Sequence, residues 1–192
     1  MEASSERPLR ADARRNRELV LASAIRLLSE SDGGGSPTLG AIAKDAGVGI
    51  GTLYRHFPTR EALVEAVYRN ELTAVCDAAP ALLAELAPLD ATRAWMDRYI
   101  DFMIAKSGMA DALRAVIASG VNPYAHSREL LGSAIRLLLD AGAADGGFRK
   151  DVDADDVLIG ISGVALAAGE QNMREQAGRL LDLLLDGLRY TP

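Results

Sequence analysis

Apolar residues recur along the chain with the three-to-four spacing that places side chains on one face of a helix. In the first segment Val20, Ala24 and Leu28 follow this spacing, which predicts a helix from about Ala13 to Glu30. Three glycines and a proline at residues 33–37 then end the helix, because these residues continue it only at high cost. No stretch of the sequence sustains a period of two, so we expect no strand.

Three more helices are predicted directly after this loop. Thr38 stands at the N-cap position of a short helix over residues 39–46, which stops at Gly47. A third helix covers residues 50–57, and Pro58-Thr59 breaks the chain and caps a fourth. Later breaks are expected at Pro80 or Pro88, Gly108, 120–123, 142–147 and near 171–172. The sequence therefore predicts an all-α chain of about nine helices.

The second and third predicted helices have the pattern of a helix-turn-helix. Ala43 is small enough for two helices to cross closely, and Gly47 can adopt the left-handed conformation that turns the chain. The apolar wedge between the helices would be Ile42, Ala46, Val48 and Leu53. The following helix presents side chains that can donate hydrogen bonds to DNA, namely Thr52, Tyr54, Arg55 and His56.

Residues 51–63, with the sequence GTLYRHFPTREAL, resemble the signature of the TetR/AcrR regulators. The resemblance covers about residues 14–68, and residues 141–157 are more loosely similar to a ligand-domain pattern of that family. It implies three DNA-binding helices followed by a divergent all-α domain that dimerises and binds effectors. It also implies phosphate contacts from Thr38, Thr52, Tyr54, His56 and Arg60, and base contacts from Ile50, Gly51 and Arg55. We add Lys44 to the expected DNA contacts.

Three features depart from the family pattern. Gly49 replaces a common serine, so the side-chain cap at the start of the recognition helix is missing. Ile50 stands where a polar residue is common; it cannot hydrogen-bond to a base, although it can pack on a thymine methyl. Gly33-Gly34-Gly35 replaces a single glycine and an aromatic residue, so we expect that loop to be more mobile.

Charge is unevenly distributed along the sequence. The chain carries a formal net charge of −6, yet residues 7–60 hold nine Lys/Arg against five Asp/Glu. This asymmetry fits a basic DNA-binding head on an acidic body, although chance patchiness explains it equally well on charge alone. A single cysteine and two histidines exclude an intramolecular disulfide and give no zinc cluster, so no metal or cofactor is expected.

No targeting or catalytic signal stands out. The thirteen residues between Asp156 and Glu170 are too few to span a bilayer, which needs about 20. The N-terminal residues lack the apolar core of a secretion signal, so we expect a cytoplasmic protein. Gly160-Ile161-Ser162-Gly163 is not a nucleophile elbow, and the acids over residues 151–156 lack EF-hand spacing and more simply cap a helix. We therefore expect no enzyme and no membrane partner.

An effector pocket is predicted in the second half of the chain. Trp95, Tyr99 and Met103 share one helix face and suit a mostly apolar, planar ligand; ordinary core packing is the alternative. His126 and Gln171 are weaker candidates for its polar contacts.

Dimerisation is predicted through the last two helices. Residues 157–169 are apolar all round, which indicates burial on both sides. Small residues would permit close approach at Gly160, Gly163, Ala167 and Gly169. A companion stripe is expected from Leu180, Leu181, Leu184, Leu185 and Leu188.

Together these features predict a regulator with three parts: a flexible arm (1–12), a three-helix helix-turn-helix domain (13–58), and a helical effector-binding and dimerisation domain (59–192). We expect it to be a homodimeric repressor that binds a near-palindromic double-stranded operator and is released by a small molecule. The alternative is an effector-blind module whose C-terminal domain only dimerises or meets a protein partner. A closed core around Trp95 and Tyr99 would favour that alternative.

Overall fold

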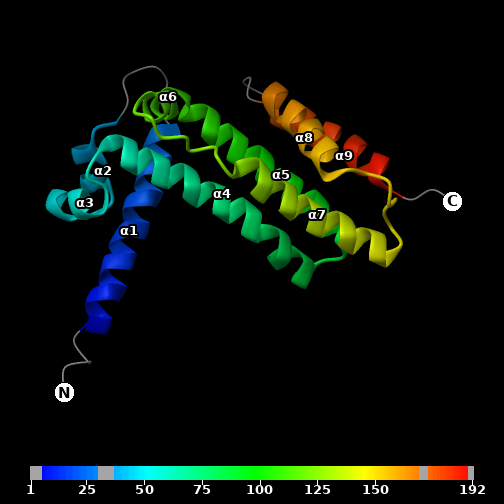
Figure 1. Ribbon diagram of the computed structural model, residues 1–192, viewed down its shortest axis with the longest axis horizontal. Helices are drawn as coiled ribbons and strands as arrows, with labels where there is room; N and C mark the ends of the chain where they lie inside the picture. The colour runs from blue at the N-terminus through cyan, green and yellow to red at the C-terminus, as the bar shows by residue number, and fades with distance from the viewer. Residues whose placement is uncertain (1–5, 30–36, 169–172, 190–192) are drawn as a thin grey trace. The chain divides into compact units, whose positions relative to one another are not determined.

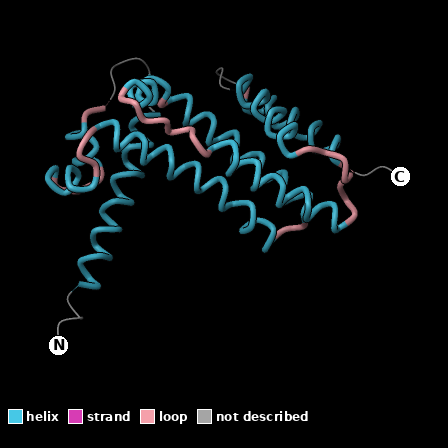
Figure 2. The backbone as a smooth tube through the Cα atoms, in the orientation of Figure 1, coloured by secondary structure: helices cyan, strands magenta, loops and turns pink. Residues whose placement is uncertain are grey.

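The computed structural model describes residues 6–29, 37–168 and 173–189, which form helices joined by short loops (Figure 1). Nine helices lie in these ranges: α1 (Glu6–Ser29), α2 (Leu39–Asp45), α3 (Ile50–His56), α4 (Arg60–Glu85), α5 (Pro88–Gly108), α6 (Ala110–Ala118), α7 (Ser127–Asp145), α8 (Ala154–Ala168) and α9 (Arg174–Leu188). The tube in Figure 2 is drawn as helix and loop throughout the described ranges. The predicted all-α fold is confirmed.

One predicted helix boundary was wrong, and one that was left open between two prolines is settled. α1 begins at Glu6 rather than Ala13, so residues 6–12 are helical instead of belonging to a flexible arm. Alanines such as Ala11 and Ala13 favour a helix and let it extend toward the N-terminus. Pro80 lies inside α4, on its exposed side, where water can satisfy the carbonyl that loses its helical partner. The break falls at the other predicted position, Pro88, which opens α5.

The chain divides into two compact units. The described residues of Met1–Asn70 and Gly108–Pro123 form the first, and those of Glu71–Ser107 and Tyr124–Pro192 form the second. The first unit thus takes in α6 from later in the chain. The predicted functional boundary after residue 58 stays a prediction. The loop of glycines at 33–35 and the candidate Gln171 lie outside the described residues.

The core of the second unit is built around α5. Trp95, Met96 and Ile100 are at most 1% exposed. α9 is tied to this helix by charge: Arg93 of α5 donates to Asp182 of α9 at 2.6 Å, and Arg174 of α9 donates to Asp97 of α5 at 3.0 Å. Ion pairs therefore hold α5 and α9 together.

The turn after α7 depends on glycine. Gly146 has a φ of +82°, and the amides of Gly147 and Phe148 both donate to the Gly142 carbonyl at 3.0 Å. A Cβ at Gly142 would lie 2.1 Å from the Phe148 ring, so only glycine fits beneath it. Phe148 also forms an isolated bridge with Arg189, which secures the end of α9.

α8 and α9 pack side by side, and α7 packs against α8 (Figure 1). Asp153 caps α8 by accepting from the Asp155 amide at 2.7 Å, which agrees with the helix-capping interpretation of the acids. The predicted companion stripe was partly wrong: Leu181, Leu185 and Leu188 are buried within their own chain, because α9 turns these side chains toward the other helices of its unit. In the described ranges, no helix combines the length and apolar character needed to cross a membrane.

Candidate functional site

A four-residue turn joins α2 to α3. Before α2, the Thr38 hydroxyl oxygen accepts a hydrogen bond from the Ala41 amide at 3.2 Å. After α2, Gly47 has a φ of +67°, which glycine adopts without strain. The Val48 amide donates to the Ala43 carbonyl at 3.0 Å and closes the turn. The predicted cap at Thr38 and the predicted turn at Gly47 are both confirmed.

One side of α3 packs into the core of its own unit and anchors the helix there. Leu53 is fully buried and Phe57, directly after the helix, is 2% exposed. α2 and α3 both pack against α1, where Val20 is fully buried, and Ile42 of α2 is 1% exposed. Because residues 53 and 57 are four apart, they lie on one face of the helix and leave the opposite face to solvent.

The opposite side of α3 is a mixed polar and apolar surface, here called the α3 face and made of Ile50, Gly51, Thr52, Tyr54 and Arg55. Ile50 is 46% exposed and Tyr54 is 50% exposed. Gly51 and Arg55 are also exposed, whereas Thr52 and the adjacent His56 are half-buried. The N-cap residue Gly49 makes no side-chain cap, as expected from the missing serine. This face offers hydrogen-bond donors, one cation and one large apolar group to a partner.

A polar cluster of the buried Ser23 with the exposed Arg26 and Asp45 ties the end of α2 to α1. The Ser23 hydroxyl lies 2.5 Å from Asp45 Oδ2 and 3.2 Å from the Ile42 carbonyl oxygen, and Arg26 pairs with the same carboxylate. The hydrogen bond from Ser23, followed by that from Arg26, holds the pKa of Asp45 below its usual range. The cluster positions α2, and hence the turn before α3. This cluster was not predicted from the sequence.

Three cations near α2 and α3 have different surroundings. Lys44 is exposed at the end of α2. The Arg60 guanidinium is half-buried and donates to the Pro37 carbonyl, which ties the start of α4 to the residues before α2. The Arg17 guanidinium lies 5.5 Å from the centre of the Phe57 ring, a cation–π contact that was not predicted from the sequence. Arg60 thus has a structural partner in addition to its predicted role at phosphate.

Similarity to known proteins covers both units. Residues 20–67 match the family described as "Bacterial regulatory proteins, tetR family", and residues 87–190 match "Transcriptional regulator SbtR-like, C-terminal domain". The TetR transcriptional regulator SCO0520 from Streptomyces coelicolor is 55% identical, with a TM-score of 0.86 over 92% of this chain and 99% of that one. The chain belongs to the TetR family of DNA-binding transcriptional regulators.

Two further relatives agree with this assignment. A TetR regulatory protein from Mycobacterium vanbaalenii is 32% identical, with a TM-score of 0.74 over 95% of this chain and all of that one. The HTH-type transcriptional regulator SAR0097 of Staphylococcus aureus (strain MRSA252) is 36% identical over 63 residues. That match spans only 33% of the length of the curated relative. These TetR-family relatives are regulators rather than enzymes, in agreement with the prediction from sequence.

The two aromatic candidates for a TetR-family effector pocket lie in the core. Trp95 and Tyr99 are 1% and 3% exposed, and their rings stack with centroids 5.7 Å apart. Trp95 Nε1 donates to the Val75 carbonyl at 2.8 Å, and the Tyr99 hydroxyl hydrogen-bonds to Ser162 at 2.7 Å. The cavity beside Trp95 measures about 10 Å³, whereas ligand pockets usually need about 300 Å³ or more. In this structure the core at these aromatics is closed.

The remaining effector candidates are dispersed. Met103 is half-buried on the same helix as the aromatics. The side chain of His126 is 71% exposed, with Nδ1 at 3.7 Å from Glu129. The structure therefore brings Trp95 and Tyr99 together and leaves His126 at the surface.

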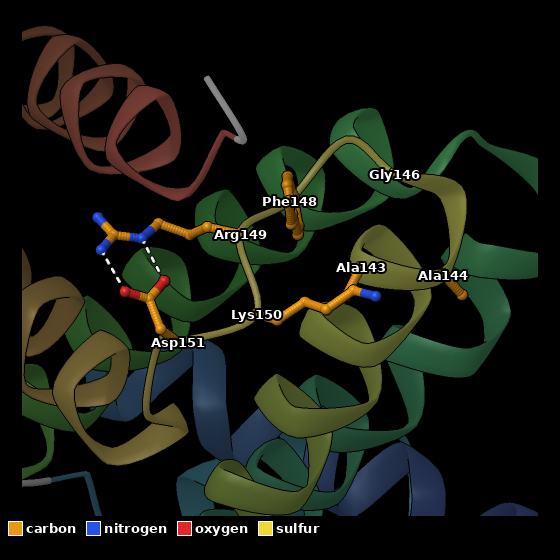
Figure 3. Close-up of a pocket in the computed structure, with 7 residues that line it drawn as sticks. All are labelled: Ala143, Ala144, Gly146, Phe148, Arg149, Lys150 and Asp151. Atoms are coloured by element: carbon orange, nitrogen blue, oxygen red, sulfur yellow. Dashed lines mark hydrogen bonds and ion pairs between the residues drawn. The ribbon is translucent and has the colours of Figure 1, made fainter. Parts of the chain in front are cut away.

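Two surface pockets in the second unit had no signal in the sequence analysis. One, of about 710 Å³, opens at the turn after α7 (Figure 3). Its lining is Ala143, Ala144, Gly146, Phe148, Arg149, Lys150 and Asp151. Arg149 donates to both Asp151 carboxylate oxygens, at 2.7 and 2.6 Å, and lowers the pKa of Asp151 to about 2. The other, of about 270 Å³, lies between α4 and α5 and includes Arg98 and Phe102.

The surroundings of the single cysteine disfavour its reactive thiolate form. Cys76 is half-buried on α4, and burial, with a smaller contribution from the Asp77 charge, raises the pKa of its thiol to about 11. The thiol therefore stays protonated at neutral pH, which disfavours nucleophilic or redox chemistry.

Proposed function

We propose that the chain is a homodimeric repressor, located in the cytoplasm, that binds a near-palindromic operator through α3. The observation that carries this proposal is the α3 face: Leu53 and Phe57 hold the helix from behind while Ile50 and Tyr54 remain about half exposed. A rigidly anchored helix with a mixed exposed surface suits the major groove, where base edges offer donors, acceptors and methyl groups.

The DNA contacts divide into two groups. Thr38, Thr52, Tyr54, His56 and Lys44 contact phosphates, which fix the position of α3 on the duplex. Ile50, Gly51 and Arg55 approach base edges. Arg60 reaches phosphate from the start of α4 while its guanidinium steadies the residues before α2 through the Pro37 carbonyl. The functional parts remain a DNA-binding segment over residues 13–58 and an effector-binding and dimerising segment over residues 59–192.

Dimerisation uses an apolar surface, here called the α8 face and made of Ile159, Gly163, Leu166 and Ala167. Ile159 is 62% exposed and Leu166 is 73% exposed, and α9 adds Leu183 at 68%. Large aliphatic side chains exposed to this degree on neighbouring helices are costly in water and are covered when a second copy packs against them. A twofold axis relates the copies, so the operator repeats with half-site centres about one helical turn, or a small multiple of it, apart.

The ligand-responsive form of this proposal requires the core around Trp95 and Tyr99 to open. A mostly apolar, planar effector would displace the Trp95–Val75 and Tyr99–Ser162 hydrogen bonds and separate α5 from α4 and α8. It releases DNA only if it binds the released state more tightly, and operator DNA then lowers effector affinity by the same factor. The closed core favours the alternative, an effector-blind module whose C-terminal helices only dimerise or meet a protein partner.

Selection of bound sites from random duplex DNA with the purified chain tests the proposed function. The expected product is a near-palindrome with two equivalent half-sites. Recovery of a single asymmetric half-site, or of no enriched sequence, contradicts it.

Screening for effectors then separates the ligand-responsive form from the effector-blind form. A compound that raises the melting temperature and releases the selected operator supports the first, and Trp95→Ala should abolish both effects. If compounds release the operator equally well from Trp95→Ala and the unchanged chain, the effector site lies elsewhere.

A further inference from the structure

The first turn of α3 exposes an apolar side chain to solvent. Ile50 is 46% exposed, although an isoleucine side chain can neither donate nor accept a hydrogen bond. Its neighbours in sequence, Gly49 and Gly51, have no side chains that could cover it. A Cβ built at Gly51 meets no atom within 4 Å. The isoleucine therefore stands beside open space in the first turn of α3.

Tyr54 extends the same side of the helix. It lies four residues after Ile50, one turn along α3, and is 50% exposed. Leu53 and Phe57 are buried on the other side, so α3 cannot rotate to hide Ile50 without exposing them. The exposed position of Ile50 is thus fixed by the packing of its own unit.

The chemistry of the major groove restricts what Ile50 can bind. Guanine offers acceptors, adenine an acceptor and a donor, and cytosine an amino donor, whereas thymine alone among the four bases presents a C5-methyl group. An isoleucine placed over a polar base edge removes water from it without replacing the hydrogen bond, which is unfavourable. Over a thymine methyl, the same side chain buries apolar surface on both partners.

We infer that Ile50 selects thymine in each operator half-site by contact with the C5-methyl group, an inference that rests on the proposed DNA-binding role of α3. It has a consequence for modified DNA. 5-Methylcytosine carries its methyl group at the same place in the major groove, so methylation of a cytosine at this position mimics thymine at the edge that Ile50 contacts. The chain thereby discriminates methylated from unmethylated cytosine at one base pair of each half-site.

The test uses the full chain and the duplex recovered by selection. Each thymine is replaced in turn by deoxyuridine, which lacks only the methyl group, and the dissociation constant is measured. At one position per half-site, uracil should weaken binding about fourfold, the ratio that corresponds to burial of one methyl-sized group, and about fifteenfold when both half-sites are changed. Cytosine at that position should bind more weakly than 5-methylcytosine by the same factor.

The variant Ile50→Ala tests whether the isoleucine side chain causes the preference for thymine. Because Ile50 is exposed, the variant should fold, with an unchanged melting temperature, and bind thymine and uracil duplexes equally. Ile117→Ala is a matched control, since Ile117 of α6 is 47% exposed and should leave the thymine preference intact. Uniform tolerance of uracil, or an equal uracil penalty in Ile50→Ala, overturns the methyl assignment. Failure to select any duplex contradicts the proposed function itself, so the two failures are distinguishable.

Discussion

The α3 face and the α8 face are both exposed, but they differ in composition. On α3, Ile50 is flanked by glycines and shares its surface with a tyrosine hydroxyl and an arginine. On α8, Ile159 and Leu166 are 62% and 73% exposed, and Gly163 and Ala167 are exposed beside them. The nearby Ser162 is half-buried and is hydrogen-bonded to Tyr99 and the Leu158 carbonyl of its own chain.

This difference indicates two kinds of partner. A mixed surface matches a groove that presents methyl groups together with donors, acceptors and phosphates. A surface with no hydrogen-bonding side chains gains only from burial against another apolar surface, and an identical copy supplies one under a twofold axis. Changes on the α3 face should therefore alter DNA binding at constant dimerisation, and changes on the α8 face should act first on dimerisation.

The largest effect is expected on the α8 face. Leu166→Glu would place one carboxylate from each copy in the proposed apolar interface, and desolvation costs several kcal/mol per ion. We expect the dimer dissociation constant to rise by more than about a hundredfold, with loss of operator binding as a consequence. Sedimentation over a range of concentrations measures the first effect.

Leu137→Glu is the control for this change. Leu137 is an exposed leucine of α7, 43% accessible, and the same substitution there should leave a dimer. If Leu166→Glu also remains dimeric at micromolar concentration, the α8 face is not the dimer interface. The proposal that the α8 and α3 faces bind two kinds of partner would then be wrong.

A smaller effect should separate two cations of the DNA-binding unit. Arg55→Ala should reduce the preference for one base pair by about 1–3 kcal/mol if the guanidinium binds guanine, with little loss on random DNA. Lys44→Ala should instead weaken all duplexes alike and reduce the salt slope by about 0.9. Titrations at several salt concentrations, on operator and random DNA, distinguish these outcomes. Equal losses on both DNAs would refute the role of Arg55 at a base.

The same substitution, glycine to alanine, can be made on each face and allows the two faces to be compared directly. Gly51 of α3 and Gly163 of α8 both have nothing within 4 Å of a Cβ built on them. Alanine at either position should stabilise the isolated helix by up to about 1 kcal/mol. Gly51→Ala should nevertheless weaken DNA binding, and Gly163→Ala should weaken the dimer, because each methyl group blocks close approach of the partner. If Gly51→Ala weakened the dimer, or Gly163→Ala weakened DNA binding in an intact dimer, the two faces would not have separate partners.

The helix-turn-helix was predictable because its signals are local. Thr38, Gly47 and Pro58 lie within one or two residues of the helix ends that they determine, and the structure confirms α2 and α3 to within a residue. The Ser23–Asp45 contact joins residues 22 apart in the sequence, and no spacing rule connects them. Arg60 shows the same limit: its charge was visible, but its contact with the Pro37 carbonyl depends on the fold.

Periodicity was less informative in the second unit. The spacing of Trp95 and Tyr99 correctly indicated a shared helix face, yet a core and a pocket wall have the same spacing, and the structure closes that region. In α9 the leucine stripe combined Leu181, which is fully buried, with Leu184, which is half-buried, while the most exposed leucine of α9 is Leu183. Apolar residues on all sides of a helix do not reveal which side meets the same chain and which meets a partner.

The smallest expected effect is a loss of stability at acidic pH, which arises from Asp45 in the DNA-binding unit. Asp45 accepts hydrogen bonds from Ser23 and Arg26, which lower its pKa in the folded chain below the ordinary carboxyl value of about 4. A lowered folded-state pKa means that the unfolded chain binds the proton more readily. The stabilisation is therefore complete above about pH 4 and disappears as the pH falls through the folded-state pKa of Asp45.

Thermal unfolding of the unchanged chain and Asp45→Asn measures this contribution. Asp45→Asn should melt at a lower temperature at pH 6, and the difference should shrink as the pH is lowered below about 4, because protonation removes the same charge. Asp140→Asn, at an exposed position of α7, controls for general effects of removing a carboxylate. If the difference between Asp45→Asn and the unchanged chain stays constant down to the acid limit, the hydrogen bonds from Ser23 and Arg26 do not favour the charged carboxylate. The attachment of α2 to α1 would then depend on contacts other than the Asp45 charge, among them the buried Val20 and Ile42.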